Sequence, residues 1–182
     1  MGTPTIVNDA VYLASQSPRR KILLSQLGID FEVLDTLDVD ETPRPDEAVG
    51  EYVERLARAK ATAGQATLPD EVIVLGADTT VAVDGAILGK PSGPDEARSH
   101  LRRLSGRTHD VYSGVAVSAG SVNALVSASR VRFRPLSDAE IAWYWRTGEP
   151  RDKAGSYAIQ GLGAMFIEHL EGSYSEIGRA HV

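Results

Sequence analysis

The stretch Val72-Ile73-Val74-Leu75-Gly76-Ala77-Asp78-Thr79-Thr80 decides the fold. Its first four residues are consecutive apolar side chains, which is typical of a strand buried on both faces of a sheet. Gly76 and Ala77 then permit a close backbone approach, and Asp78 is expected at the end of the strand. Because ligand sites of α/β sheets lie outside such strand ends, the stretch predicts a buried sheet with a cleft beside Asp78. The alternative is that Asp78 merely begins a turn.

Strands and helices alternate around this stretch. The elements expected before it are a strand at 11–14, a helix begun by Ser17 and Pro18 and ended by Gly28, a strand at 31–34, an acidic loop at 35–46 and a helix at 48–66. Those expected after it are a hairpin of 80–83 and 86–88 around Asp84-Gly85, a helix at 94–104, antiparallel strands at 109–119 and 124–133, a helix from Ser137 to Trp143 with Glu140 in its capping box, and two short strands within 155–170. The pattern predicts a mixed α/β domain with a cleft between two lobes.

Composition excludes several classes of protein. The chain has 182 residues, 42% of them hydrophobic and 24% charged, which suits one globular domain rather than a disordered chain, a collagen or a coiled coil. It has no cysteine, which excludes disulfides, zinc-thiolate sites and a cysteine nucleophile. No apolar run approaches the roughly 20 residues that span a bilayer, and residues 1–9 lack the pattern of a secretory signal, so we expect a cytoplasmic protein without a membrane partner. The net charge of −6 argues against a nucleic-acid partner.

The segment Leu13-Ala14-Ser15-Gln16-Ser17-Pro18-Arg19-Arg20 joins a strand to the N-terminus of a helix. Free backbone N–H groups and the helix dipole favour an anion at such a position. Arg19 and Arg20 add guanidinium donors that match phosphate oxygens. The segment therefore indicates an anion site, and the alternative is a capped helix that carries two solvated arginines.

Two further segments carry polar groups among small residues. Lys90, in Leu88-Gly89-Lys90-Pro91, offers a point charge for phosphate, although a lone surface lysine is the commoner explanation. In Asp152-Lys153-Ala154-Gly155-Ser156-Tyr157-Ala158-Ile159-Gln160-Gly161, the Gln160 amide has a donor and an acceptor that suit the edge of a base. The alternative there is a glycine-rich turn. Glu41 and Lys60 give weaker signals, because a solvated loop acid and a snorkelling lysine are the ordinary expectations.

Five motifs in this order and spacing resemble the Maf family of nucleoside triphosphate pyrophosphatases. They are Ser15-Gln16-Ser17-Pro18-Arg19-Arg20, Gly76-Ala77-Asp78-Thr79, Gly89-Lys90-Pro91, Leu104-Ser105-Gly106-Arg107-Thr108-His109 and the segment Asp152 to Gly161. The resemblance extends from Tyr12 to Ser175. It implies an elongated two-lobed α/β fold with a central cleft, shared with inosine triphosphate pyrophosphatases, and hydrolysis of a nucleoside triphosphate to the monophosphate and diphosphate.

The resemblance also implies roles for individual residues. Asp78 matches the catalytic base. The residues that match substrate-binding positions are Ser15, Arg19, Arg20, Lys60, Thr79, Lys90, Lys153 and Gln160, with Arg19, Thr79 and Gln160 associated with base selectivity. Glu41 and Asp78 match the metal ligands. Since only oxygen ligands are available there, Mg²⁺ or Mn²⁺ is the expected cofactor.

The motifs resemble the branch of the family that acts on dTTP and UTP more than the branch that prefers 7-methyl-GTP. That second branch tends to have a tryptophan in place of Arg19 and a glutamate in place of Gln160. A nucleotide-binding regulator of cell division with little catalysis is an alternative from another class, and hydrolysis of modified pyrimidine nucleotides is a third. Besides the nucleoside triphosphate, a second copy of the chain is an expected partner, because members of the family often form dimers.

The C-terminus departs from the family pattern. After Gly172-Ser173-Tyr174-Ser175 the family continues into a strand and a final helix, whereas this chain ends as Glu176-Ile177-Gly178-Arg179-Ala180-His181-Val182. The last six residues match an in-frame translation of a common sequencing-library adapter. We therefore expect a C-terminally truncated domain at 11–175 and a non-native tail at 176–182.

Overall fold

A computed structural model describes residues 11–35 and 38–173 of the chain. This part folds into one seven-stranded mixed sheet with four α-helices and three short 3-10 helices. In chain order the elements are β1 (Val11–Ala14), α1 (Pro18–Gln26), β2 (Phe31–Val33), α2 (Val49–Gln65), β3 (Ile73–Val83), β4 (Ala86–Leu88), α3 (Pro94–Leu104), β5 (Thr108–Ser118), β6 (Val122–Phe133), α4 (Asp138–Arg146), η1 (Glu149–Asp152), η2 (Ala154–Ser156), η3 (Leu162–Phe166) and β7 (Ile167–Glu171).

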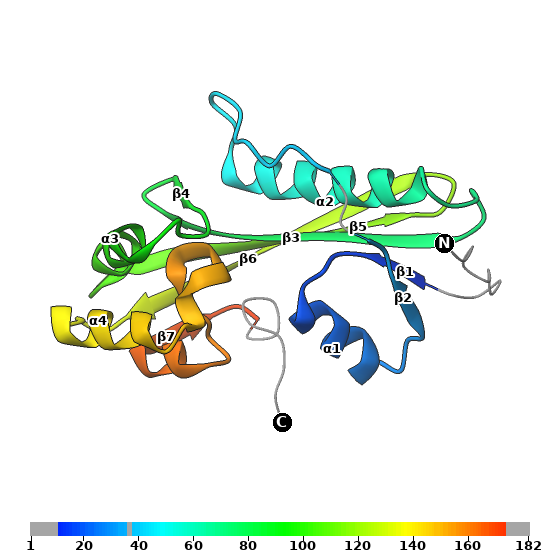
Figure 1. Cartoon of the computed structure of the whole chain (residues 1–182). Helices are drawn as coiled ribbons and strands as arrows, with labels where there is room; N and C mark the ends of the chain where they lie inside the picture. Colours follow the sequence, from blue (N-terminus) through cyan, green and yellow to red (C-terminus); the bar gives the residue numbers. More distant parts are fainter. Residues whose placement is uncertain (1–10, 36–37, 174–182) are drawn as a thin grey trace.

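The sheet joins two lobes. Its strand order is β2-β1-β3-β5-β6-β7, with β4 paired to β3 outside this path. Strand β1 runs parallel to β2 and β3, whereas the other pairs are antiparallel. Figure 1 shows β3, β5 and β6 running the length of the elongated molecule, with β1, β2 and α1 at one end and α3, α4 and β7 at the other. The expected mixed α/β fold of two lobes is confirmed.

Strand β3 differs from the expectation. It continues without a break through Ile73–Val83, so Asp78 lies in the middle of a strand rather than at its end. Residues 74–82 of β3 pair with β5 along their whole length, and this ladder keeps the backbone extended past Gly76. On its other edge, β3 pairs with β1 as far as Gly76 and with β4 only from Val81. Residues 77–80 thus face a gap in the sheet between the two lobes.

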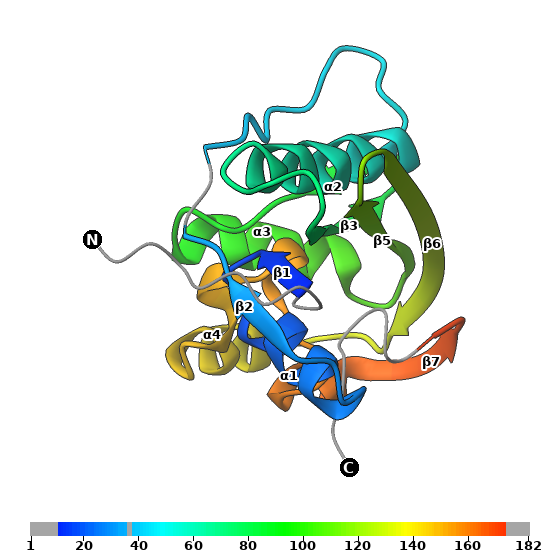
Figure 2. The same cartoon turned by 90° about the vertical axis from the view of Figure 1, so that its right-hand side faces the viewer.

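Helix α2 packs along β3 and β5 on one face of the sheet (Figures 1 and 2). The close approach depends on two glycines of the sheet. A Cβ at Gly76 would overlap the carbonyl oxygen of Ala57 and lie 2.5 Å from the backbone nitrogen of Ala61, and a Cβ at Gly114 would lie 2.7 Å from the carbonyl oxygen of Val53. Hence the expected close backbone approach at Gly76 is made by a helix.

Two local expectations need correction. Residues 155–170 form two 3-10 turns and part of β7 rather than two short strands, because Gly155 and Ser156 take left-handed φ values of 66° and 63° that break an extended chain. Ser17 does occupy the N-cap of α1, yet its side chain makes no capping hydrogen bond. Other turn signals are confirmed: Gly28 follows the end of α1 with φ 68°, and Asp84-Gly85 joins β3 to β4.

The largest apolar core lies between the sheet and the α3–α4 lobe. Its fully buried members include Leu101, Phe133, Tyr144 and Phe166. Among the described helices, none is both long enough and apolar enough to cross a membrane. The expected domain limit at residue 175 and the expected tail at 176–182 fall outside the described residues.

Candidate active site

A cavity of about 680 Å³ opens at the gap in the sheet, within the size range of small-molecule sites. Segments from both lobes line it: the β1–α1 junction, the middle of β3, one side of α2, the residues after β4, and η1 with η2. Its polar and charged lining residues are Ser15, Gln16, Ser17, Arg19, Arg20, Asp35, Glu41, Tyr52, Lys60, Asp78, Thr79, Thr80, Lys90, Asp152, Lys153 and Tyr157. Eight of the nine residues predicted to bind substrate or act in catalysis, together with the predicted metal ligand Glu41, therefore come together here.

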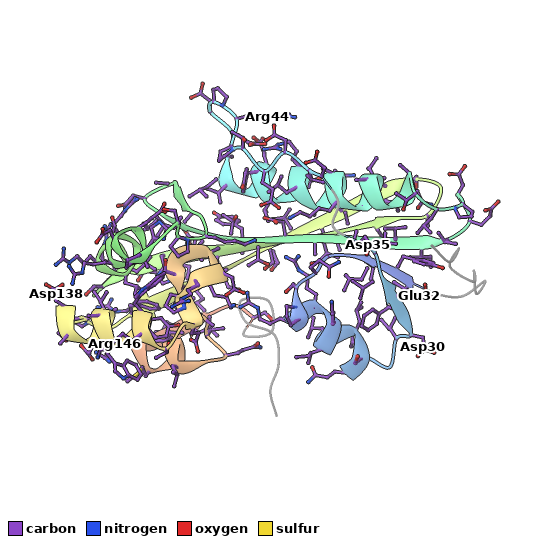
Figure 3. All side chains as sticks on the ribbon, viewed as in Figure 1. Asp30, Glu32, Asp35, Arg44, Asp138 and Arg146 are labelled. Atoms are coloured by element: carbon purple, nitrogen blue, oxygen red, sulfur yellow. The ribbon has the colours of Figure 1, made fainter. Side chains whose placement is uncertain are left out.

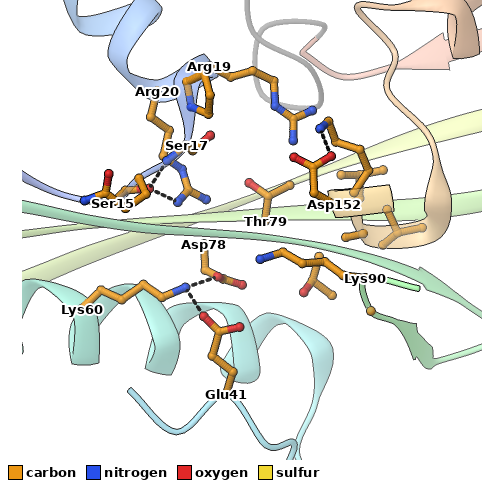
Figure 4. A pocket seen from close by; sticks show the side chains of 18 of the residues that line it. Ser15, Ser17, Arg19, Arg20, Glu41, Lys60, Asp78, Thr79, Lys90 and Asp152 are labelled. Atoms are coloured by element: carbon orange, nitrogen blue, oxygen red, sulfur yellow. Dashed lines mark hydrogen bonds and ion pairs between the residues drawn. The ribbon is translucent and has the colours of Figure 1, made fainter. Parts of the chain in front are cut away.

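The junction of β1 and α1 contributes guanidinium and hydroxyl groups. Arg20 Nη1 donates a hydrogen bond to Ser15 Oγ at 2.7 Å, and the backbone N–H of Ser17 donates to the same oxygen at 3.3 Å. These bonds fix the turn that leads from the strand into the helix. As a result, the N-terminus of α1 faces the cavity with Arg19 and Arg20 beside it (Figure 4). This is the arrangement of an anion site.

Lys60 of α2 lies between two carboxylates. Its Nζ is 2.7 Å from Asp78 Oδ1 and 2.7 Å from Glu41 Oε1 (Figure 4). The side chains of Lys60 and Asp78 are only 16% and 12% exposed, so water screens their attraction weakly. Lys60 is therefore an ion-pair partner inside the cavity rather than a snorkelling surface lysine.

Burial and charge act in opposite directions on the two carboxylates. Burial raises the pKa of Asp78 against the opposing effect of the Lys60 ammonium. Burial also disfavours ionisation of Glu41, but the hydrogen bond and charge of Lys60 outweigh it and lower the pKa of Glu41. A carboxylate with a raised pKa beside a fixed ammonium is suited to accept a proton.

The same two carboxylates fit a divalent cation. Both already face one positive charge, and their contacts with Lys60 use only Oδ1 of Asp78 and Oε1 of Glu41. The donors are hard oxygens, as Mg²⁺ and Mn²⁺ prefer, and Mg²⁺ is commonly held by one or two carboxylates together with substrate phosphates. Within the described ranges, no cluster of three or more His, Cys, Asp or Glu side chains offers a fuller set of ligands.

Tyr52 of α2 is a lining residue that sequence reasoning missed. Its hydroxyl donates a hydrogen bond to the backbone oxygen of Glu41 at 2.9 Å and so fixes the loop that carries this carboxylate. The helical spacing of Tyr52 placed it on the apolar face of the helix, which is also where its ring lies. Its role beside the cavity becomes visible only once that loop is packed against α2.

On the opposite face of β3, Thr79 faces a second polar group of the cavity. Successive side chains of a strand point to opposite faces, so Thr79 faces away from Asp78, toward α1 and η1 (Figure 4). Asp152 is there, ion-paired with Lys153 and facing the guanidinium of Arg19. Asp152 belongs to a quoted motif but was not predicted as a site residue. Burial lowers the pKa of Arg19, opposed by the carboxylates of Asp152 and Glu149.

Gln160 is the predicted site residue that does not line the cavity, although its neighbour Ile159 does. Its Nε2 is buried and has no hydrogen-bond partner among the described residues. The turn after Gln160 is held by Glu149, which accepts hydrogen bonds from the N–H groups of Leu162 at 2.9 Å and Gly163 at 3.0 Å.

Two buried histidines support the η2 segment from behind. His100 Nδ1 lies 2.9 Å from Ser156 Oγ, and His109 Nε2 lies 2.8 Å from the hydroxyl of Tyr157. Neither imidazole lines the cavity. Both imidazoles therefore have structural positions behind the wall of the cavity.

Charged side chains away from the cavity point outward. Figure 3 labels several of them at the periphery, including Asp30 and Glu32 at β2 and Asp138 and Arg146 on α4. Many pair with each other: Arg102, for example, makes a two-pronged contact with Asp138 at 2.9 and 2.8 Å. The charged residues of both signs that line the cavity are thus distinct from those of the outer surface, and they are the candidate functional residues.

Comparison with known proteins agrees with this geometry. Residues 10–178 match the family described as Maf-like protein. The chain is 52% identical to the dTTP/UTP pyrophosphatase of Hahella chejuensis over 168 residues, which cover 91% of this chain and 83% of that protein. It is also 52% identical to the dTTP/UTP pyrophosphatase of Aromatoleum aromaticum, with 94% of this chain and 89% of that protein covered.

A solved structure shows a similar fold at low sequence identity. The Staphylococcus aureus Ham1 protein superposes with a TM-score of 0.50 at 15% identity, covering 68% of this chain and 71% of that one. This likeness concerns the arrangement of strands and helices alone.

Proposed function

Since this chain belongs to the Maf family, we propose that it is a nucleoside triphosphate pyrophosphatase that hydrolyses dTTP and UTP to the monophosphate and diphosphate. The observation that carries this proposal is the ion-paired group of Lys60, Asp78 and Glu41, which faces an open cavity beside the N-terminus of α1. Such a site offers a proton acceptor, fixed positive charge and room for a triphosphate. Relatives about 50% identical over most of the chain support the choice of dTTP and UTP.

Asp78 is the proposed catalytic base. Its carboxylate orients a water molecule and takes one proton from it, while the water oxygen forms a bond to the α-phosphorus. The bond from that phosphorus to the bridging oxygen breaks, and the diphosphate leaves with the electron pair. Lys60 supports this role because it holds Asp78 in one orientation, with the second carboxylate oxygen outside the ion pair.

The cationic side chains of the cavity stabilise the charge that develops. Arg20, Lys60 and Lys90 line the part of the cavity nearest Asp78, and the Ser15 hydroxyl fixes Arg20. Such preorganised donors stabilise the transition state because they need no reorientation when the bond breaks. The same groups would hold the β- and γ-phosphates in the ground state.

Glu41 and Asp78 would hold the divalent cation. When bound, Mg²⁺ or Mn²⁺ supplies positive charge to the phosphate oxygens and increases the electrophilicity of the α-phosphorus. Tyr52 holds the backbone of Glu41 in place for this role.

A nucleotide panel tests the proposal. The full chain is incubated with UTP, dTTP, CTP, ATP, GTP and 7-methyl-GTP in Mg²⁺ or Mn²⁺, and diphosphate release is measured. We expect UTP and dTTP to be the best substrates, and Asp78→Asn to lower kcat by about 10²-fold or more. Asp110→Asn is the matched control, because Asp110 lies on the neighbouring strand and pairs with Arg130 outside the cavity.

Each other outcome contradicts a stated part of the proposal. Preference for 7-methyl-GTP would place the chain in the other branch of the family. Nucleotide binding without diphosphate release would favour a binding protein over an enzyme. Full activity of Asp78→Asn would remove Asp78 from its role.

A further inference from the structure

The cavity has two charged groups along β3, one around Asp78 and one around Asp152. The first contains Lys60, Arg20 and Lys90 against the carboxylates of Asp78 and Glu41, so its cations are in excess even before a divalent ion binds. The second, which we call the Asp152 group, consists of Arg19, Asp152 and Lys153 (Figure 4). Asp78 and Thr79 are adjacent in β3, so a ligand whose phosphates lie at Asp78 can cross the open edge of residues 77–80 to reach this group.

The Asp152 group is poorly suited to a polyphosphate. Its two cations are balanced by Asp152 and by the nearby Glu149 carboxylate, and an exposed carboxylate at the cavity wall repels phosphate oxygens. The Asp152 side chain is 72% exposed, so a ligand can reach it. A hydrogen bond from Lys153, together with the charge of Arg19, lowers the pKa of Asp152. Asp152 is therefore ionised at neutral pH and only accepts hydrogen bonds.

The group offers one acceptor, Asp152, and two donors, Arg19 and Lys153. Arg19 faces Asp152 from α1, and Lys153 contacts it from the same loop. The Watson–Crick edge of uracil or thymine has the complementary set of groups: one N3–H donor and two carbonyl oxygens. Cytosine has an unprotonated N3 and an amino group at C4, so it would set a lone pair against Asp152 and an N–H against a cation. Guanine likewise directs its amino group at one of the donors.

Resting on the proposed function, we propose that Asp152 is the specificity-determining acceptor that binds N3–H of uracil and thymine, with Arg19 and Lys153 as donors to the flanking carbonyl oxygens. This assigns recognition of the base to η1 and the start of α1. Gln160, the residue first expected to contact the base edge, lies outside the cavity lining. Discrimination follows because the wrong base directs a lone pair at the Asp152 carboxylate or an N–H at a cation, and both contacts are repulsive.

The test compares substrates within one variant. Asp152→Asn replaces the fixed acceptor by an amide that both donates and accepts. We expect the ratio of kcat/KM for UTP to that for CTP to fall by about 10-fold or more, as the loss of one specific base contact does elsewhere. Asp35→Asn is the matched control: Asp35 is another exposed acid of the cavity lining, so this variant removes the same charge. This variant should change kcat/KM for all nucleotides by a similar factor and leave the ratio for UTP and CTP unchanged.

A modified substrate tests the same contact by removing the donor of the base instead of the acceptor of the protein. N3-methyl-UTP lacks the N3–H, so wild-type protein should use it about 10-fold or more worse than UTP. Asp152→Asn should lose most of that difference, because its neutral amide is no longer a charged group that can only accept. Melting curves of both variants confirm folding, and the exposed position of Asp152 predicts little change.

Two results would overturn the inference. One is an unchanged ratio of UTP to CTP in Asp152→Asn, and the other is an equal loss with every nucleotide, which would make Asp152 a general structural or phosphate contact. Failure of the proposed function would give a different result, because wild-type protein would then release no diphosphate from any nucleotide.

Discussion

Gly76 of β3 lies against Ala57 of α2 so closely that a Cβ on the glycine would overlap the carbonyl oxygen of the alanine. This contact lies one turn from Lys60, whose ammonium pairs with Asp78 two residues beyond Gly76. The absence of one side chain in the sheet therefore sets the distance between a helix and the proposed catalytic carboxylate. Packing and chemistry are coupled at this point.

The first prediction follows from that contact. Gly76→Ala should force α2 away from β3, because backbone atoms cannot rotate aside as side chains do. We expect a loss of about 2–3 kcal/mol in the free energy of unfolding, together with a lower kcat as Lys60 moves from Asp78. Denaturant unfolding and diphosphate release measure the two effects.

Gly50→Ala is the control, because a Cβ there meets only the ring of Tyr112 at an ordinary 3.9 Å. It should be neutral or slightly stabilising, by up to about 1 kcal/mol, since alanine favours helix. Equal stability of Gly76→Ala and Gly50→Ala would contradict the packing argument.

Local sequence patterns predicted most of the elements. The capping box of Ser137 and Glu140 begins α4, with Ser137 N–H donating to Glu140 Oε2 at 2.8 Å. The glycine after α1 and the Asp84-Gly85 turn are also where the patterns placed them. Such signals act between residues close in the chain, so each can be recognised without knowledge of the fold.

Contacts between distant segments explain what the patterns missed. Asp78 looked like a residue after a strand because Gly76 and Ala77 follow the apolar run, whereas pairing with β5 keeps β3 extended through them. The cleft beside it forms because β1 stops and β4 has not begun. Similarly, Asp152 can be recognised as a candidate site residue only because it faces Arg19, which lies 133 positions earlier in the chain. No local signal reports such a pairing.

The second prediction concerns Lys60. Lys60→Met removes the ammonium that lies between Asp78 and Glu41, and we expect a loss of about 2 kcal/mol in stability. This is less than a fully buried broken ion pair costs, because Asp78 can take up a proton. Added Mn²⁺ should raise the Tm of Lys60→Met more than that of wild-type protein, since the two free carboxylates then share the ion.

The control for this comparison is Arg58→Met on the same helix. Arg58 pairs with Glu54 near the surface, where both side chains are about 40% exposed, and such pairs contribute about 1 kcal/mol or less. Its response to Mn²⁺ should equal that of wild-type protein. A larger response in Arg58→Met than in Lys60→Met would show that the ion binds elsewhere.

The third prediction concerns the carboxylate of Glu149. It accepts hydrogen bonds from the backbone of Leu162 and Gly163 and from the Tyr144 hydroxyl. In Glu149→Gln, an amide NH2 group replaces one of the two carboxylate oxygens, so a donor faces a donor and a hydrogen bond is lost. We therefore expect the free energy of unfolding to fall by about 2 kcal/mol. Urea unfolding measures it, and Glu168→Gln, which removes a surface pair with Arg132, is the control. Similar stabilities for the two variants would exclude a supporting role for Glu149.

The fourth prediction is a loss of stability in acid caused by His109. Its ring is 2% exposed and packs edge-on against Phe133 and Tyr157, with centroids 5.0 and 5.4 Å away. Burial lowers the pKa of His109 to about 4, against 6.5 for an exposed histidine. Between these two values the unfolded chain binds a proton that the folded chain does not, so stability decreases as the pH falls through this window.

His109→Leu isolates this effect, because every other titrating group, His100 included, stays in place. Between pH 7 and pH 5, wild-type protein should lose about 2 kcal/mol more stability than His109→Leu, since each unit of pKa shift corresponds to about 1.4 kcal/mol once the pH lies below 6.5. Urea unfolding at both pH values gives the comparison. Parallel losses in the two proteins would mean that the imidazole is protonated in the folded state, which its burial among apolar side chains argues against.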